Sequence, residues 1–112
     1  MKKLVFLLLA AFAFANVYAD QPVINKDDCT ITKDGKTFPL YGKVKIVDSF
    51  PDLKVQIVES FPDLEVKLVD SFPDNCGKVK IVDSFPDVKI QIVNSFPDIK
   101  VKIVDSFPGV KR

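Results

Sequence analysis

The sequence predicts an all-β fold built from short repeats, on three observations. Six units of eleven residues follow one another along most of the chain, and each reads close to x-K-V-K-I-V-D-S-F-P-D. Each unit carries β-branched residues in partial alternation, which is typical of a strand. A Pro every eleven residues leaves no room for a helix. The units are Gly42–Asp52, Leu53–Asp63, Leu64–Asp74, Gly77–Asp87, Val88–Asp98 and Ile99–Gly109. A unit this short cannot bury its own apolar face, so the units must pack on one another.

Each unit has room for one strand of about five residues, roughly 17 Å long, followed by a corner. Val44–Val47 represents the strand in the first unit. Ser49–Asp52 represents the corner, in which Ser and Asp bond to local backbone. Pro51 fixes its own φ and favours an extended conformation for Phe50.

The repeats also have a longer period. Asn75 and Cys76 interrupt the array between the third and fourth units, and Gly-Lys opens both the first and the fourth. Gln replaces Lys at Gln56 and Gln91, in the second and fifth units. We therefore interpret the chain as two circuits of three strands with approximate three-fold symmetry.

Two circuits of this kind predict which units are neighbours. Unit one would lie beside four, two beside five and three beside six, in a compact solenoid-like or interlaced arrangement. Gln56 would then neighbour Gln91 in an amide ladder. The alternative is a sequential meander, closed or open, in which unit one pairs with unit two.

In the first unit Val44 and Ile46 share one face of the strand and Lys45 lies on the other. One valine in each unit falls on the same face as this Lys. Either these valines tuck under the Phe of a neighbouring corner, or they form an exposed apolar ring that meets a partner or a second copy of the chain. The residues are Val47, Val58, Val69, Val82, Val93 and Val104.

The first nineteen residues predict a secretory signal peptide. Met1–Lys3 is a basic start, Leu4–Ala15 is apolar, and cleavage after Ala19 or after Ala15 follows small residues. The apolar run is too short for a stable membrane span, so we expect export to the periplasm or the exterior and no stable membrane insertion. Residues 20–41 then form an N-terminal cap, and residues 42–112 form the repeat domain.

The cap segment contains the only hairpin signal. Thr30–Phe38 alternates around an Asp34-Gly35 turn. We expect it to cover a sheet edge that would otherwise aggregate, with binding of a target as the alternative.

Two cysteines remain after export, Cys29 and Cys76. In an oxidising compartment the economical interpretation is one disulfide between them. It would tie the cap segment to the junction between the two circuits.

The composition argues against catalysis, metal binding and nucleic-acid binding. The chain has no His, and its Ser-Asp pairs lie in repeated turns without a base, so we predict no enzyme, no cofactor and no catalytic or metal-binding residue. Removal of residues 1–19, which include Lys2 and Lys3, leaves 93 residues with 14 Lys and Arg against 15 Asp and Glu. This near-neutral balance argues against nucleic acid as a partner.

The tandem V-K-I-V-D-S-F-P-D and V-Q-I-V-E-S-F-P-D units resemble those of short exported bacterial repeat proteins of unknown function. The resemblance covers residues 42–109 and brings no catalytic or binding residue with it. It implies a compact β fold in which the chain winds round twice and, in one arrangement, interlaces with itself as a knot.

Three functional hypotheses follow. The first is a structural or protein-interaction role, with an unknown protein or envelope component as partner and homo-oligomers as one form. The second is a secreted effector or inhibitor that binds its target through Thr30–Phe38. The third is calcium binding by acids that stacked turns bring together, such as Asp48 and Asp83.

Overall fold

The computed structural model describes residues 21–111, so the predicted signal peptide lies outside the described residues. All regular structure in this range is β. The strands are β1 (Val23–Asn25), β2 (Thr30–Lys33), β3 (Lys36–Pro39), β4 (Gly42–Ile46), β5 (Leu53–Ile57), β6 (Leu64–Leu68), β7 (Lys78–Ile81), β8 (Val88–Ile92), β9 (Ile99–Ile103) and β10 (Gly109–Val110). The predicted all-β class is confirmed, with one strand in each repeat unit.

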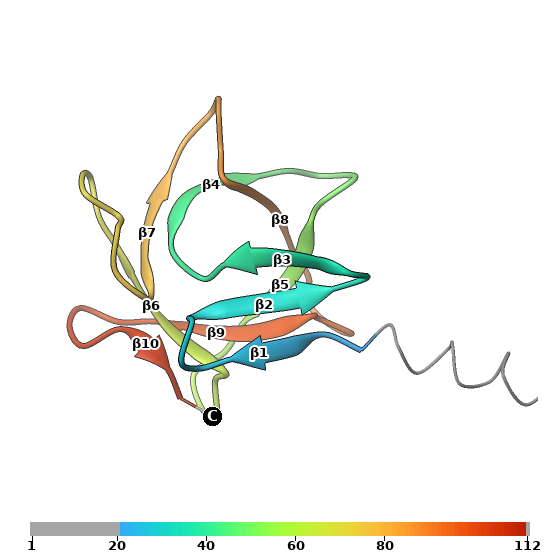
Figure 1. Ribbon diagram of the computed structural model, residues 1–112, viewed down its shortest axis with the longest axis horizontal. Coiled ribbons are helices and arrows are strands. Elements are labelled where there is room, and N and C mark those ends of the chain that lie inside the picture. Colours follow the sequence, from blue (N-terminus) through green and yellow to red (C-terminus); the bar gives the residue numbers. More distant parts are fainter. Residues whose placement is uncertain (1–20, 112) are drawn as a thin grey trace, which may run out of the picture.

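The six repeat strands close into a parallel barrel (Figure 1). Their order is β6, β7, β4, β8, β5 and β9, and β9 pairs with β6 to complete the ring. Strands of the first circuit, β4 to β6, alternate with strands of the second, β7 to β9. Each strand therefore pairs on both sides with the other circuit. This confirms two interlaced circuits, and the sequential meander is wrong.

Pairing of units one with four, two with five and three with six is also confirmed. The expected Gln ladder is wrong, because Gln91 lies opposite Lys54 and Gln56 opposite Lys100. The physical reason is that β8 lies between β4 and β5 and must pair with both, which offsets the circuits by two residues. Each Gln donates to a corner carbonyl instead: Gln56 Nε2 to Asn94 O at 3.1 Å, and Gln91 Nε2 to Asp48 O at 2.9 Å.

Exposure divides the barrel interior into a sealed end and an open end. Positions are counted here from the first residue of each eleven-residue unit. Side chains at the first position, such as Leu53 and Ile99, are 2–3% exposed, and valines at the third position, such as Val55, are 5–9% exposed. Fifth-position side chains, from Ile46 to Ile103, are 43–52% exposed. Because alternate residues of a strand share one face, all three positions line the interior. The barrel is therefore closed where its strands begin and open where they end.

Four of the six corners, those of the first, second, fourth and fifth units, are held at both ends by one neighbouring strand. In the first corner the Val47 N–H donates to Ile90 O and the Asp52 N–H donates to Lys89 O, both at 2.8 Å. The Asp52 carboxylate also accepts the Lys89 N–H at 2.9 Å. Asp63, Asp87 and Asp98 accept the equivalent N–H groups of Lys100, Lys43 and Lys54. The last Asp of each of these four corners therefore clamps the two circuits together.

The predicted conformation of the corner Phe is wrong. The corner Phe is not extended but left-handed, with φ between 53° and 56° in all six units. Residues 47 and 52 are bonded to adjacent residues of β8, so the four residues between them must travel out and back within a short distance. In these clamped corners a left-handed residue turns the chain back, against the local preference before Pro51. Phe72 has the same φ although Asp74 makes no such bond, so the clamp is not the sole cause of the conformation.

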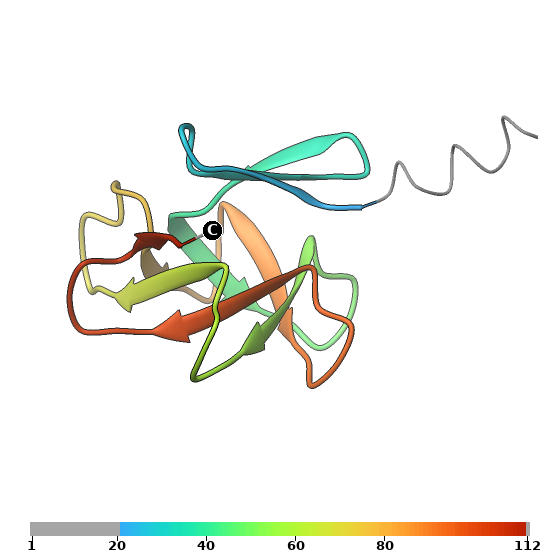
Figure 2. The ribbon, with the colours of Figure 1, turned by 90° about the horizontal axis from the view of Figure 1, so that it is seen from below.

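The N-terminal segment forms a three-stranded antiparallel sheet that closes the sealed end of the barrel. The β2–β3 hairpin turns at Asp34-Gly35 as predicted, with positive φ at both residues. In Figure 2 this sheet, coloured blue to cyan, lies above one end of the barrel. Ile31 is completely buried beneath it. The expectation of a sheet-edge cover is wrong in detail, because a closed barrel has no edge and the cap covers its end.

Substitutions of Asp98 and Asp87 separate the contribution of the corner clamp to stability from that of the contact with the cap. Asp98 accepts the Lys54 N–H at 2.7 Å and also pairs with Lys33 Nζ of the cap at 2.8 Å, whereas Asp87 clamps only Lys43. We expect Asp87→Ala to lower the free energy of unfolding by about 1–2 kcal/mol and Asp98→Ala by about 1 kcal/mol more. Urea unfolding measures both. Equal losses would mean that Lys33 contributes nothing to holding the cap.

Candidate functional site

The predicted disulfide is present, with Cys29 and Cys76 bonded and their Cα atoms 5.7 Å apart. Two hydrogen bonds beside it continue the link: the Leu40 N–H donates to Cys29 O at 2.9 Å, and the Gly77 N–H donates to Leu40 O at 3.0 Å. Cys29 belongs to the buried core. The pair therefore fixes the cap to the start of the second circuit, which is a structural role.

The other polar groups that the sequence draws attention to are scattered. Asp48 and Ser49 are exposed, as are the equivalent residues of the other corners, at separate points around the barrel. Within residues 21–111 no group of three or more His, Cys, Asp or Glu side chains is arranged to hold a metal ion, and no polar or charged side chain is buried. Within the described residues, therefore, the acids of the corners are not brought together as calcium binding would require.

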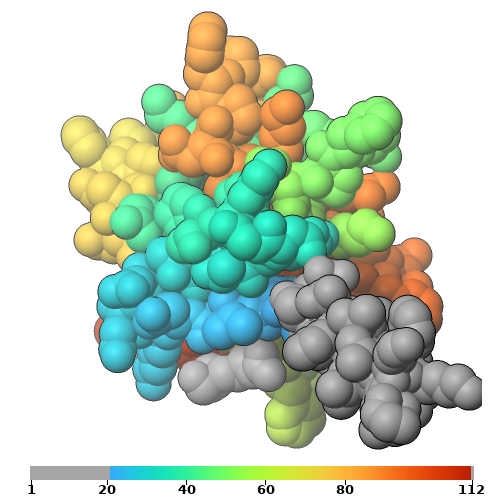
Figure 3. Space-filling model, turned by 45° about the vertical axis from the view of Figure 1, so that its right-hand side comes forward, coloured from blue at the N-terminus to red at the C-terminus, as the bar shows by residue number. Residues whose placement is uncertain are grey.

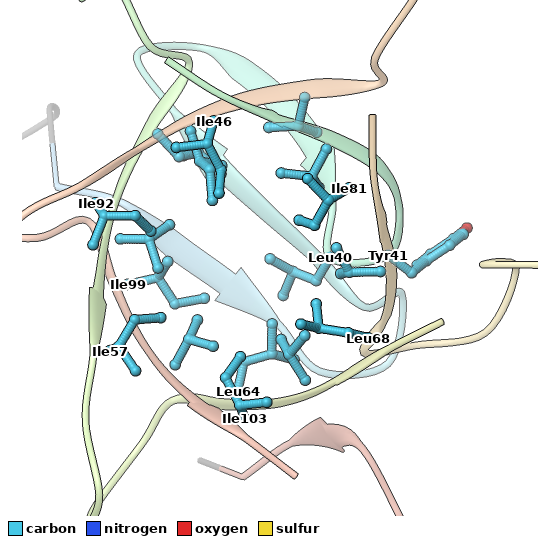
Figure 4. Close-up of a pocket in the computed structure, with 18 of the residues that line it drawn as sticks. Leu40, Tyr41, Ile46, Ile57, Leu64, Leu68, Ile81, Ile92, Ile99 and Ile103 are labelled. Atoms are coloured by element: carbon cyan, nitrogen blue, oxygen red, sulfur yellow. The ribbon is translucent and has the colours of Figure 1, made fainter. Parts of the chain in front are cut away.

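The most prominent hollow is inside the barrel. It is a cavity of about 190 Å³ that begins at Leu40 of the cap and runs past all six strands to the fifth-position ring. Figure 4 shows Ile46, Ile57, Leu64 and Ile99 pointing into it from different strands, while the Tyr41 ring extends away with its hydroxyl outermost. The remaining lining side chains are aliphatic. The cavity wall is therefore hydrocarbon.

The stagger between neighbouring strands explains why a six-stranded barrel has this space. The residue offset at each pairing accumulates around the ring, and a larger stagger gives a wider barrel at a fixed strand number. Valines fill most of the middle layer, and they are short side chains. They leave the axis of the barrel unfilled.

Contact between water and the apolar wall of this cavity is unfavourable. Water does not fill it well, because a buried water needs two to four polar partners and the wall has none. The physical chemistry of the cavity favours an apolar occupant.

The rim of the cavity is a ring of six aliphatic side chains, each about half exposed, where the strands end. We call it the apolar rim. Its members are Ile46, Ile57, Leu68, Ile81, Ile92 and Ile103. The rim is the entrance to the cavity, since the opposite end is closed by the cap.

Six corner phenylalanines form a second exposed apolar feature, which we call the Phe corners. They are 79–92% exposed, so each ring is almost entirely in solvent. The residues are Phe50, Phe61, Phe72, Phe85, Phe96 and Phe107. Figure 3 shows corners projecting from the body, such as the orange one at the top and the yellow one at the left. In Figure 2 the β5–β6 and β8–β9 corners are the lowest points, at the end away from the cap.

The two interpretations of the valines are both corrected. Val47 and its five equivalents are half-buried, and the exposed Phe rings do not cover them. The exposed apolar ring exists, but it is made by the fifth-position residues and the Phe corners. Sequence reasoning missed these because the fifth position continues the alternation of the core and the Phe was assigned to packing.

The comparisons agree with this architecture. The model of the 7(1) septoil knot domain matches residues 37–111, which include every repeat strand and the end of the cap hairpin. The chain belongs to this family. No curated protein matches the chain in sequence. The interlaced arrangement considered in the sequence analysis is therefore a knot domain, and no helix able to cross a membrane occurs within residues 21–111.

Proposed function

We propose that this chain is an exported protein with a structural or protein-interaction role and no catalytic site, and that the Phe corners are its contact surface. The observation that carries the proposal is the combination of near-complete exposure and positive φ at all six phenylalanines. Exposure of a Phe ring to water contributes no favourable free energy to folding, and a left-handed conformation costs a residue with a Cβ about 1–2 kcal/mol. Gly or Asn would make the same corner more easily, so selection for the ring itself is the simplest explanation.

The chemistry of the corners favours a protein partner. Aromatic side chains are enriched in protein interfaces, where a ring enters a pocket and polar neighbours surround it. Each Phe follows a Ser, and an acid or Asn precedes that Ser, as in Asp48-Ser49-Phe50. These carboxylates would be repelled by an anionic membrane surface and attracted to Lys or Arg. The partner is therefore a periplasmic or extracellular protein with apolar pockets bordered by basic residues.

Export is supported by the basic start and apolar run of residues 1–15 and by the disulfide, since disulfides persist in oxidising compartments. The absence of His from the chain and the apolar interior support a role without catalysis. Residues Asp34 to Thr37 at the hairpin turn are exposed. The hairpin is therefore the alternative binding surface that the affinity capture below must distinguish from the Phe corners.

Phe61→Asn tests whether a corner Phe has a structural task. Asn tolerates positive φ better than Phe and removes an exposed ring, so we expect the free energy of unfolding to be unchanged or to rise by up to about 1 kcal/mol. Chemical denaturation measures it. A loss of several kcal/mol, as for truncation of a core aromatic, would assign the ring to packing and contradict the proposal.

Affinity capture tests the contact surface. The full chain, oxidised, serves as bait for envelope and culture-supernatant extracts, and a variant with all six corner Phe changed to Asn serves as the probe. We expect a specific protein to be retained by the wild type and lost by this variant. The matched control changes the six corner Ser to Ala and leaves the rings in place, and it should retain the partner. Retention by the Phe variant with loss on Lys36→Ala would instead favour the hairpin as the binding element.

A further inference from the structure

We infer that the barrel cavity is a binding site for the end of an alkyl chain, which enters through the apolar rim while its polar head stays in water. The inference concerns the cavity and does not depend on the Phe corners.

The shape of the cavity selects this ligand class. It is closed by Leu40 and the cap at one end, and it opens between six half-exposed aliphatic side chains at the other. A ligand longer than the cavity must therefore enter by one end and leave its other end outside. A molecule with a hydrocarbon tail and a polar head satisfies both conditions.

The wall excludes polar ligands. Ligand sites for polar molecules place a few donors or acceptors among apolar residues. Here Leu53, Leu64, Val88 and Ile99 form the deep layer, and no buried side chain among residues 21–111 is polar. A polar group inside would lose its hydrogen bonds to water without replacement.

The volume sets the length of the buried tail. A cavity of about 150 Å³ accommodates one benzene molecule, so the 190 Å³ here takes roughly six to eight carbons. Chains of about ten carbons would fill the cavity and reach past the rim. Chains of four carbons would leave it partly empty.

The mouth does not select one head-group charge. Four lysines lie beside the rim at the fourth strand position, and five acids follow two residues beyond it: Lys45, Lys67, Lys80 and Lys102, and Asp48, Glu59, Asp70, Asp83 and Asp105. Cations and anions therefore surround the entrance together. The tail, rather than the head, determines binding.

Titration with sodium decanoate below its micellar concentration tests the inference directly on the full oxidised chain. We expect one saturable site in the micromolar-to-millimolar range, with methyl NMR shifts confined to cavity residues such as Val55, Val66 and Ile57. Butyrate should bind at least about tenfold more weakly, because it buries fewer methylenes. Decyltrimethylammonium should bind about as well as decanoate.

Two variants and a control locate the site. Val66→Phe fills the cavity and Ile57→Glu places a charge in the apolar rim, and each should weaken decanoate binding at least about tenfold. Ile57 is 45% exposed, so its variant should fold even where Val66→Phe does not. Val93→Phe adds the same bulk outside the cavity lining and should leave binding within about twofold.

Phosphatidylcholine vesicles distinguish the two sources of an alkyl chain. Uptake of labelled lipid that decanoate blocks would assign the chain to a bilayer lipid, and decanoate binding without uptake would assign it to a free amphiphile. Failure of decanoate to saturate a site, or unchanged binding in both variants, would overturn the inference. So would a dimer whose second copy closes the rim and which decanoate neither enters nor dissociates.

Discussion

Removal of the disulfide should lower the free energy of unfolding by about 4 kcal/mol, because the bond closes a loop between cysteines 47 residues apart. The loop contains the cap hairpin and the whole first circuit, from β2 to β6. In the unfolded chain it restricts half of the domain at once. For a domain of this size that free energy corresponds to a fall in Tm of about 15–30 °C.

The measurement is thermal unfolding of a Cys29→Ala, Cys76→Ala double variant against the oxidised wild type. Ala keeps the small apolar volume that buried Cys29 occupies, so little packing is lost. Dithiothreitol should lower the Tm of the wild type to that of the variant and should leave the variant unchanged, which controls for reductant effects. A difference of less than 5 °C would mean that Lys33–Asp98 and the Leu40 hydrogen bonds already hold the cap, and that the disulfide is redundant.

Much of the fold follows from the repeat alone. The 35-residue period predicts two circuits of three strands and three of the six pairings, those of equivalent units such as the two that carry Gln56 and Gln91. The other three, β4 with β8, β5 with β9 and β6 with β7, follow only from closure of the ring. The β-branched alternation predicts an inward face with Val55 and its equivalents on it. These features are local or periodic, so they can be recognised in a single sequence without a structure.

The register, the cavity and the corner conformation were not predicted from the sequence, because they depend on closure of the six strands into a barrel. Whether the circuits stack in register or are offset by two residues is decided by β8 pairing with β4 and β5 together, and no single unit records it. The offset removes the Gln ladder, widens the barrel and creates the cavity. It also sets the out-and-back path of the corner, in which Phe50 has a positive φ against its local preference.

The candidate site was therefore predictable only in part. The sequence shows a recurrent Phe and recurrent apolar residues, and it raises an exposed apolar ring as one alternative. It assigns that ring to Val47 and its equivalents, which the structure places half-buried. The open end of the barrel depends on the fifth-position residues being uncovered where the strands end, and this is a property of the assembled barrel.

A Gly77→Ala substitution should be among the most damaging single changes in the chain. A Cβ built at this position lies 2.7 Å from Glu65 O, Gly109 N and Pro108 Cβ. Two of these atoms are backbone, from β6 and β10, so they cannot move aside as a flexible side chain does. Gly77 also has φ of +82°, which disfavours any residue with a Cβ.

The two effects can be separated, because Gly35 in the hairpin turn has the same φ of +82° and nothing within 4 Å of its Cβ position. Gly35→Ala should lower the free energy of unfolding by about 1–2 kcal/mol, which measures the backbone effect alone. Gly77→Ala should lose at least about 3 kcal/mol, and the difference reports the close packing where the second circuit begins between β6 and β10. Equal losses in urea unfolding would show that the junction between the circuits has room to relax. The steric constraint that makes Gly77 obligatory would then be wrong, and the Gly-Lys that opens the first and fourth units would be explained by backbone conformation alone.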